Sequence, residues 1–79
     1  MKMLYIVNKG TADPTGASVP FHIAANGSVE EGHEVSVVLA GDATELVVGD
    51  RAQEVEGLGV PPLRDLLSKL REHEVPVYV

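Results

Sequence analysis

The sequence contains no cysteine, and its aromatic residues are limited to Tyr5, Phe21 and Tyr78. Without cysteine, the 79 residues of this chain can form no disulfide and perform no thiolate chemistry. Basic residues are also scarce, because 12 Asp and Glu oppose 6 Lys and Arg and leave a formal net charge of −6. A surface that binds nucleic acid or an anionic membrane needs a basic patch, so neither partner is expected.

Long apolar runs are missing as well. No segment approaches the roughly 18 consecutive apolar residues of a transmembrane helix. The apolar run near the N-terminus stops at Asn8 and is too short for a signal peptide. We therefore expect a cytoplasmic protein.

What remains is the composition of one small folded domain that spans residues 1–79. The chain has 79 residues, of which 44% are hydrophobic and 23% are charged. A domain of this size buries about 60–65% of the surface that its unfolded chain exposes, so its core alone gives marginal stability. Since disulfides are excluded, partner subunits are the expected source of further stability.

Three short apolar runs predict three β-strands. The first two are apolar on both faces, which is typical of strands in a parallel sheet. The predicted strands are Met3–Val7, Val35–Ala40 and Val75–Val79.

A helix is predicted over Val19–Glu31, after a polar turn. Thr15 or Ser18 can cap it, and Pro20 is tolerated if it lies in the first helical turn. Gly32 follows at the position where a helix end favours a left-handed residue. One face of this helix combines apolar and small residues that permit close packing on a sheet, namely Phe21, Ala24, Ala25 and Ser28.

The segment after the second strand predicts a short helix and then a loop. Asp42 is a good cap for a helix over Ala43–Val48, and Glu45 has the spacing of a capping box. The acidic, glycine-bearing stretch Gly49–Val60 is predicted to be mostly loop.

The clearest helix begins after Pro61 and Pro62. Asp65 and Lys69 lie four residues apart on its polar side and predict a weakly stabilising pair. Its apolar stripe has the spacing of a buried helix face and consists of Leu63, Leu66, Leu67 and Leu70. We expect the whole stripe to be buried, so that Leu67→Ala would nearly unfold the domain.

The resulting order of elements, β-α-β-α-α-β, predicts an α/β fold with a doubly wound parallel sheet. The long connections between strands suit crossovers rather than hairpins. We expect the strand order 2-1-3, with helices on both faces. Because the sequence ends within an apolar strand, we also expect the natural polypeptide to be longer.

Common catalytic and binding motifs are not matched. The glycines do not form a phosphate loop or a dinucleotide fingerprint, and no nucleophile elbow is present. His22, His33 and His73 lack the spacing of a zinc site. We therefore predict no metal, no cofactor and no catalytic residue in this chain.

Several segments together resemble the DsrE/DsrF-like family. They are Asp13-Pro14-Thr15, Pro20-Phe21-His22-Ile23-Ala24-Ala25, Glu31-Gly32-His33-Glu34-Val35, Leu39-Ala40-Gly41-Asp42-Ala43-Thr44-Glu45-Leu46, Gly59-Val60-Pro61-Pro62-Leu63 and Val75-Pro76-Val77-Tyr78-Val79. The resemblance covers nearly the whole chain in the same order. It implies a flavodoxin-like single domain that assembles as a trimer or hexamer.

The resemblance also implies a function. The better understood members of this family relay sulfur as a Cys persulfide, whereas many others have no assigned function. The sulfur-handling Cys would be expected directly after Val79, so the 79 residues correspond to the N-terminal two-thirds of a typical member. No residue in this chain can itself carry sulfur covalently.

A candidate ligand site follows from the predicted topology. In a sheet ordered 2-1-3, the crevice lies between the carboxyl ends of the first and third strands, and the next helix N-terminus favours an anion or a thiolate there. The residues predicted to line it are Asn8, Lys9, Asp13 and Thr15, with Asp42 as a further candidate. The alternative is that these residues serve only as turn and cap residues.

Two functions remain open at this point. The first is sulfur relay or sulfane-sulfur binding through a Cys beyond Val79, with a sulfur-carrier protein as a partner. The second is a non-catalytic ligand-binding or structural module on the same fold. In either case, we expect a homotrimer or homohexamer.

Overall fold

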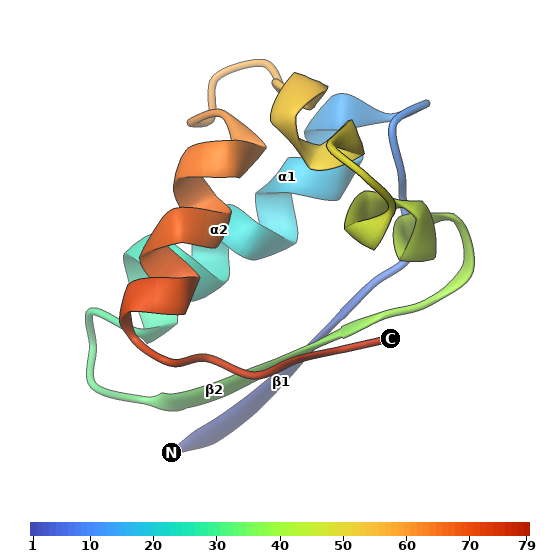
Figure 1. The fold of residues 1–79 in the computed structure, drawn as a ribbon. Helices are drawn as coiled ribbons and strands as arrows, with labels where there is room; N and C mark the ends of the chain where they lie inside the picture. The colour runs from blue at the N-terminus through green and yellow to red at the C-terminus, as the bar shows by residue number, and fades with distance from the viewer.

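The computed structural model describes residues 1–79 as a two-layer α/β fold, with one layer of helices on one β-sheet (Figure 1). Three strands, two α-helices and three shorter helical segments follow one another along the chain. The strands are β1 (Lys2–Val7), β2 (Glu34–Leu39) and β3 (Val77–Tyr78). The helical elements are α1 (Pro14–Ile23), the π-helix η1 (Ala24–Ser28), the 3-10 helices η2 (Gly41–Val47) and η3 (Arg51–Glu54), and α2 (Leu63–Glu72).

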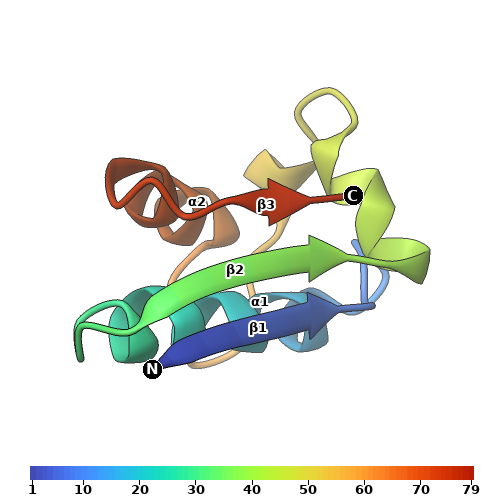
Figure 2. The ribbon, with the colours of Figure 1, turned by 90° about the horizontal axis from the view of Figure 1, so that it is seen from below.

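The three strands form a parallel sheet in which β2 lies at the centre (Figure 2). Tyr5 pairs with Val37 on one side of β2, and Val77 pairs with Val37 on the other. The predicted parallel α/β sheet is confirmed, but the predicted order 2-1-3 is wrong, because the order is β1-β2-β3. β3 continues the sheet beyond β2 instead of returning to the free side of β1.

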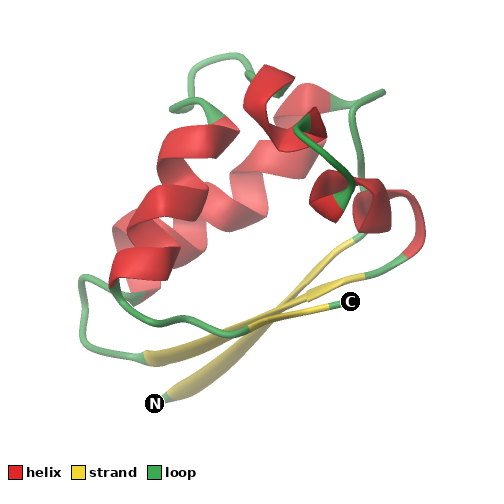
Figure 3. Ribbon diagram, viewed as in Figure 1, coloured by secondary structure: helices red, strands yellow, loops and turns green.

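All helices lie on one face of the sheet (Figure 3), which corrects the expectation that they cover both faces. The strand order explains this arrangement. Since crossovers between parallel strands are right-handed, two crossovers that proceed in the same direction place their helices on the same face. The opposite face is left bare, and Leu4, Ile6 and Tyr78 are 60%, 64% and 57% exposed there.

The first helix begins earlier than predicted. α1 starts at Pro14, and its N-cap is Asp13 rather than Thr15 or Ser18, because the Asp13 carboxylate accepts a hydrogen bond of 2.9 Å from the Gly16 N–H. Pro14 occupies the first helical position, where its missing N–H has no consequence.

Pro20 therefore lies inside the helix and not in its first turn. Because proline has no N–H, the helical bond to the Gly16 carbonyl is lost there. Downstream, the chain widens into η1, and Val29 N–H donates to the Ala24 carbonyl at 3.0 Å, as in a π-turn. The predicted buried face is confirmed, and Gly32 has the predicted left-handed conformation, with φ at +81°.

The second α-helix follows its prediction closely, with Pro62 at the N-cap position. Leu63, Leu66 and Leu70 are buried, and they pack with Phe21 in the centre of the core. Leu67 is only partly buried at the edge of this core, so the prediction that the whole stripe is buried is wrong. None of the helices has both the length and the apolar character that a membrane crossing requires.

Candidate functional site

The structure does not form the predicted crevice between β1 and β3. β2 separates these strands, so their carboxyl ends lie about 10 Å apart, which is two strand spacings. The carboxyl end of β1 instead lies next to that of β2, where the Ala40 N–H donates to the Val7 carbonyl at 2.9 Å. The loop after β1 therefore packs against η2.

Gly10 makes this packing possible. It is buried, and a Cβ atom there would lie 2.5 Å from the Asp42 carbonyl oxygen and 2.9 Å from Cδ of Glu45. Only glycine fits such a close approach without a shift of the backbone. The sequence analysis missed this role, because Gly10 lies in the polar turn after the strand, where glycine is common for conformational reasons alone.

Glu45 fixes the same loop through its side chain. Its carboxylate accepts hydrogen bonds from the Thr11 hydroxyl and from the Thr11 backbone N–H, the latter at 2.8 Å. These hydrogen bonds lower the pKa of Glu45, and the nearby Arg51 acts in the same direction. The predicted capping box is wrong, because Glu45 bonds to a distant loop and η2 has no side-chain cap.

Two of the five predicted site residues perform structural roles. Asp13 caps α1, so its own carboxylate occupies part of the anion-binding position at this helix N-terminus. The Thr15 hydroxyl accepts a hydrogen bond of 3.0 Å from the Leu58 N–H and so holds the segment before α2 against the start of α1. Gly57 permits this contact, since a Cβ atom there would lie 2.8 Å from Cα of Thr15.

The other three predicted residues, Asn8, Lys9 and Asp42, are exposed at the carboxyl end of the sheet. The segments that carry them are in contact through their backbones. A Cβ atom added to Gly41 would lie 3.8 Å from the Asn8 carbonyl oxygen. Asp42 lies in the first turn of η2 and caps nothing. Lys9 forms no ion pair, so the arrangement offers one ammonium group, one amide and one carboxylate to a small polar ligand.

A second polar cluster joins η1 to α2. Lys69 donates a hydrogen bond of 2.6 Å to Oδ1 of Asn26, and it forms an ion pair with Glu30. Asn26 also contacts Nδ1 of His22 at 3.0 Å. The predicted pair between Asp65 and Lys69 is therefore wrong, because Lys69 bonds across to the neighbouring helical segment.

This cluster is structural in character. The hydrogen bond from Lys69 and its charge lower the pKa of Glu30, which remains ionised and paired at neutral pH. No group of three or more histidine or carboxylate side chains is arranged to hold a metal ion anywhere in the chain.

The fold defines a small α/β domain in which helices cover one face of a three-stranded parallel sheet. A model of the DsrE/DsrF-like family matches residues 1–79, and the chain belongs to that family. The resemblance seen in the sequence is thereby confirmed. No curated protein and no solved structure matches the chain.

Proposed function

We propose that this protein serves sulfur relay or sulfane-sulfur binding as a DsrE-like subunit whose reactive thiol lies outside these 79 residues. The observation that carries the proposal is the family match along the whole chain, which contains no cysteine. In the better understood members of the family, the persulfide is carried by a Cys that would be expected directly after Val79 in this sequence. The present chain then supplies the scaffold on which that thiol is held.

The proposed subunit is cytoplasmic and assembles as a homotrimer or homohexamer that exchanges sulfur with a sulfur-carrier protein. The bare face of the sheet supports the assembly, because parallel sheets are normally covered on both faces. Light scattering on a size-exclusion column tests this proposal, with a mass of three or six subunits expected at micromolar concentration. A stable monomer would contradict it.

Mass spectrometry tests the sulfur chemistry. The natural polypeptide is incubated with polysulfide, and its intact mass is compared with that of residues 1–79 alone under the same treatment. We expect the natural polypeptide to gain sulfur that dithiothreitol removes, whereas residues 1–79 gain none. A natural polypeptide that lacks cysteine, or that gains no reducible sulfur, would refute the proposal.

A second candidate function is non-catalytic binding of a small anion at the carboxyl end of the sheet. The observation that favours it is the Lys9 ammonium group, which forms no ion pair and adjoins the exposed amide of Asn8. In this proposal, Asp13 and Thr15 hold the loop and the helix start that frame the site.

Thiosulfate is a suitable probe for this site. We expect it to shift the amide resonances of the loop after β1, and we expect Lys9→Ala to abolish the shifts. Lys2→Ala removes the same charge from the opposite end of β1 and should leave them unchanged. Equal shifts in both variants would show that no specific site exists.

A further inference from the structure

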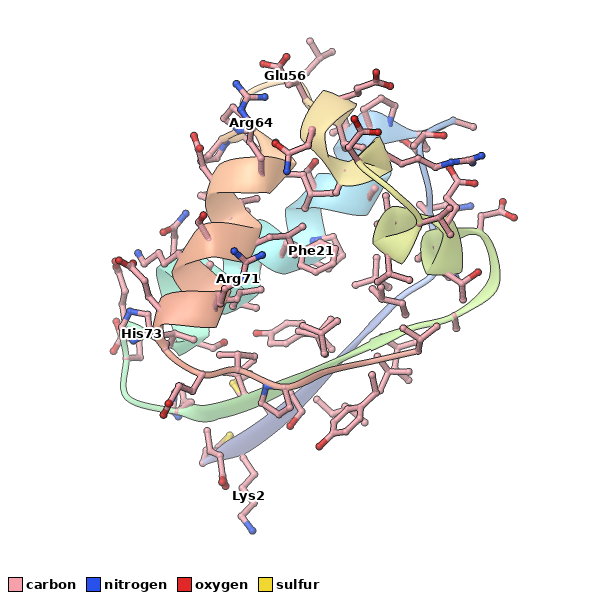
Figure 4. All side chains as sticks on the ribbon, viewed as in Figure 1. Lys2, Phe21, Glu56, Arg64, Arg71 and His73 are labelled. Atoms are coloured by element: carbon pink, nitrogen blue, oxygen red, sulfur yellow. The ribbon has the colours of Figure 1, made fainter.

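The first helix, α1, has an apolar side that is exposed to solvent. Val19 and Ile23 lie one turn apart on this side and are 37% and 48% exposed. Phe21 lies between them in the sequence and is buried, with its ring among the core side chains between the helices and the sheet (Figure 4). Because residues two positions apart point to nearly opposite sides of a helix, Val19 and Ile23 project away from the core. We call this surface the outer side of α1.

The outer side of α1 also lacks charged residues. No Asp, Glu, Lys or Arg lies between Asp13 and Glu30, which is the longest such stretch in the chain. The two acidic residues that bound it are engaged within their own chain, because Asp13 caps α1 and Glu30 pairs with Lys69. The exposed side of a helix normally carries charged and polar residues, so an apolar and uncharged one indicates an interface.

The other α-helix of the same layer has the usual exposed side. The exposed positions of α2 carry Arg64, Asp65, Ser68, Arg71 and Glu72. Figure 4 shows Arg64 and Arg71 projecting from this helix. The apolar outer side is therefore a property of α1 itself and not of the whole helical layer.

Further strands of the same sheet would leave the outer side of α1 uncovered. Crossovers between parallel strands are right-handed. A strand added beyond β3 therefore places its helix beside α2, and a strand added beside β1 places its helix on the bare face of the sheet. In both cases, the outer side of α1 remains at the boundary of the domain.

The spacing of the two apolar residues identifies a second copy of the chain as the occupant. When two identical helices cross antiparallel about a twofold axis, each residue before the axis meets the residue equally far beyond it in the other copy. Val19 then faces the partner's Ile23, and this contact occurs twice. A Cβ atom added to Gly27, one turn beyond Ile23, would meet no atom within 4 Å, so the helix surface there is open to a partner.

The net charge of the chain supports the same occupant. Each copy carries a formal net charge of −6, so two copies repel each other unless they meet on a surface without acidic residues. The outer side of α1 meets this condition. A basic partner, in contrast, would gain no electrostatic attraction from a surface that offers no carboxylate.

We propose that the outer side of α1 packs against the same side of a second copy about a twofold axis. The inference rests on the assembly proposed above, because it decides between the two forms of that assembly. A twofold contact joins subunits in pairs, so two threefold rings that meet through it form a hexamer and not a trimer. Three such contacts then act together between the rings, which strengthens a contact that is small in a single pair.

Light scattering on a size-exclusion column tests the contact in the natural polypeptide. We expect a mass of six subunits for the wild type and of three for Ile23→Glu, a twofold fall, because the new carboxylate would be buried against Val19 without a partner. Ser68→Glu adds the same charge to the exposed side of α2 and should leave the mass at six subunits. Circular dichroism of each variant verifies that the fold is retained.

The wild-type mass separates this inference from the proposed assembly. A mass of three subunits would overturn the twofold contact and leave the threefold ring intact. A mass of two subunits that Ile23→Glu reduces to one would support the contact and contradict the threefold ring. A mass of six subunits that Ile23→Glu leaves unchanged, or that Ser68→Glu also halves, would overturn the contact.

Mixing two variants tests the antiparallel pairing directly. Val19→Lys alone should also halve the mass, because the new ammonium group would face the partner's Ile23. An equimolar mixture of Val19→Lys and Ile23→Glu should restore six subunits. In that mixture, each contact pairs the introduced lysine with the introduced glutamate and leaves one Val19 facing the partner's Ile23. Failure of the mixture to restore the mass would overturn the proposed pairing.

Discussion

Glu74 occupies a backbone position that favours glycine, and replacing it should stabilise the protein. It is the only residue other than glycine with a positive φ, at 56°. It directly follows His73, which is the C-cap residue of α2. The Val75 N–H donates to the Leu70 carbonyl and the Glu74 N–H donates to the Arg71 carbonyl, both at 3.0 Å. These two bonds define a Schellman motif, in which the left-handed residue is usually glycine.

The expected gain follows from three contributions. Relief of the left-handed conformation stabilises the folded state by about 1–2 kcal/mol. The greater freedom of glycine in the unfolded chain offsets about 0.5–1 kcal/mol of this. Removal of a negative charge from the C-terminus of α2 adds about 0.3–1 kcal/mol, because that end of a helix carries partial negative charge. Glu74→Gly should therefore raise the free energy of unfolding by about 1 kcal/mol.

Urea titration followed by circular dichroism measures this change. A gain of 1 kcal/mol should raise the melting temperature by about 4–8 °C in a domain of this size, with an unchanged slope of the urea transition. Glu74→Ala is the matched control, because it removes the charge and retains the strained φ. If Glu74→Gly were no more stable than Glu74→Ala, the explanation from backbone strain would be refuted.

Two further predictions concern the core and the response to acid. Leu66 is 1% exposed, so Leu66→Ala should destabilise by about 2–5 kcal/mol, whereas the partly buried Leu67 should give a clearly smaller loss on truncation; equal losses in urea titration would contradict the packing. Glu30 and Glu45 have lowered pKa values in the folded state, so their stabilisation is present above the unfolded pKa of 4.5 and is lost as the pH falls through the folded pKa. Glu30→Gln and Glu45→Gln should each flatten the dependence of the urea midpoint on pH below about 5. An unchanged dependence would show that the carboxylate has the same pKa in the folded and unfolded states.

Local sequence patterns were sufficient for the elements that depend on hydrophobic periodicity. β1, β2 and α2 lie where the apolar runs and the leucine stripe place them. Their burial is dictated by side chains within the same segment. The short 3-10 helix η3 was missed, because an acidic stretch with glycines gives no such periodic signal.

The features that required distant partners could not be predicted. The strand order depends on whether the second crossover passes β2 in the same direction as the first, and both alternatives need connections of the same length. Lys69 had a plausible partner four residues away, yet Glu30 and Asn26 become available only when η1 and α2 meet. The candidate site could not be predicted for the same reason. Its predicted crevice required β1 and β3 to be neighbours, whereas β2 lies between them.

The strand order has a consequence for how the protein is made. The order of β1, β2 and β3 across the sheet is the same as the order in which the ribosome synthesises them. N-terminal segments can fold before later ones are synthesised. Each new strand can pair with the strand synthesised just before it, because that strand lies at the open edge of the sheet. No pair of strands that has already formed must separate to make room. Synthesis in this molecule can therefore extend the sheet in one direction, from its first strand to its last.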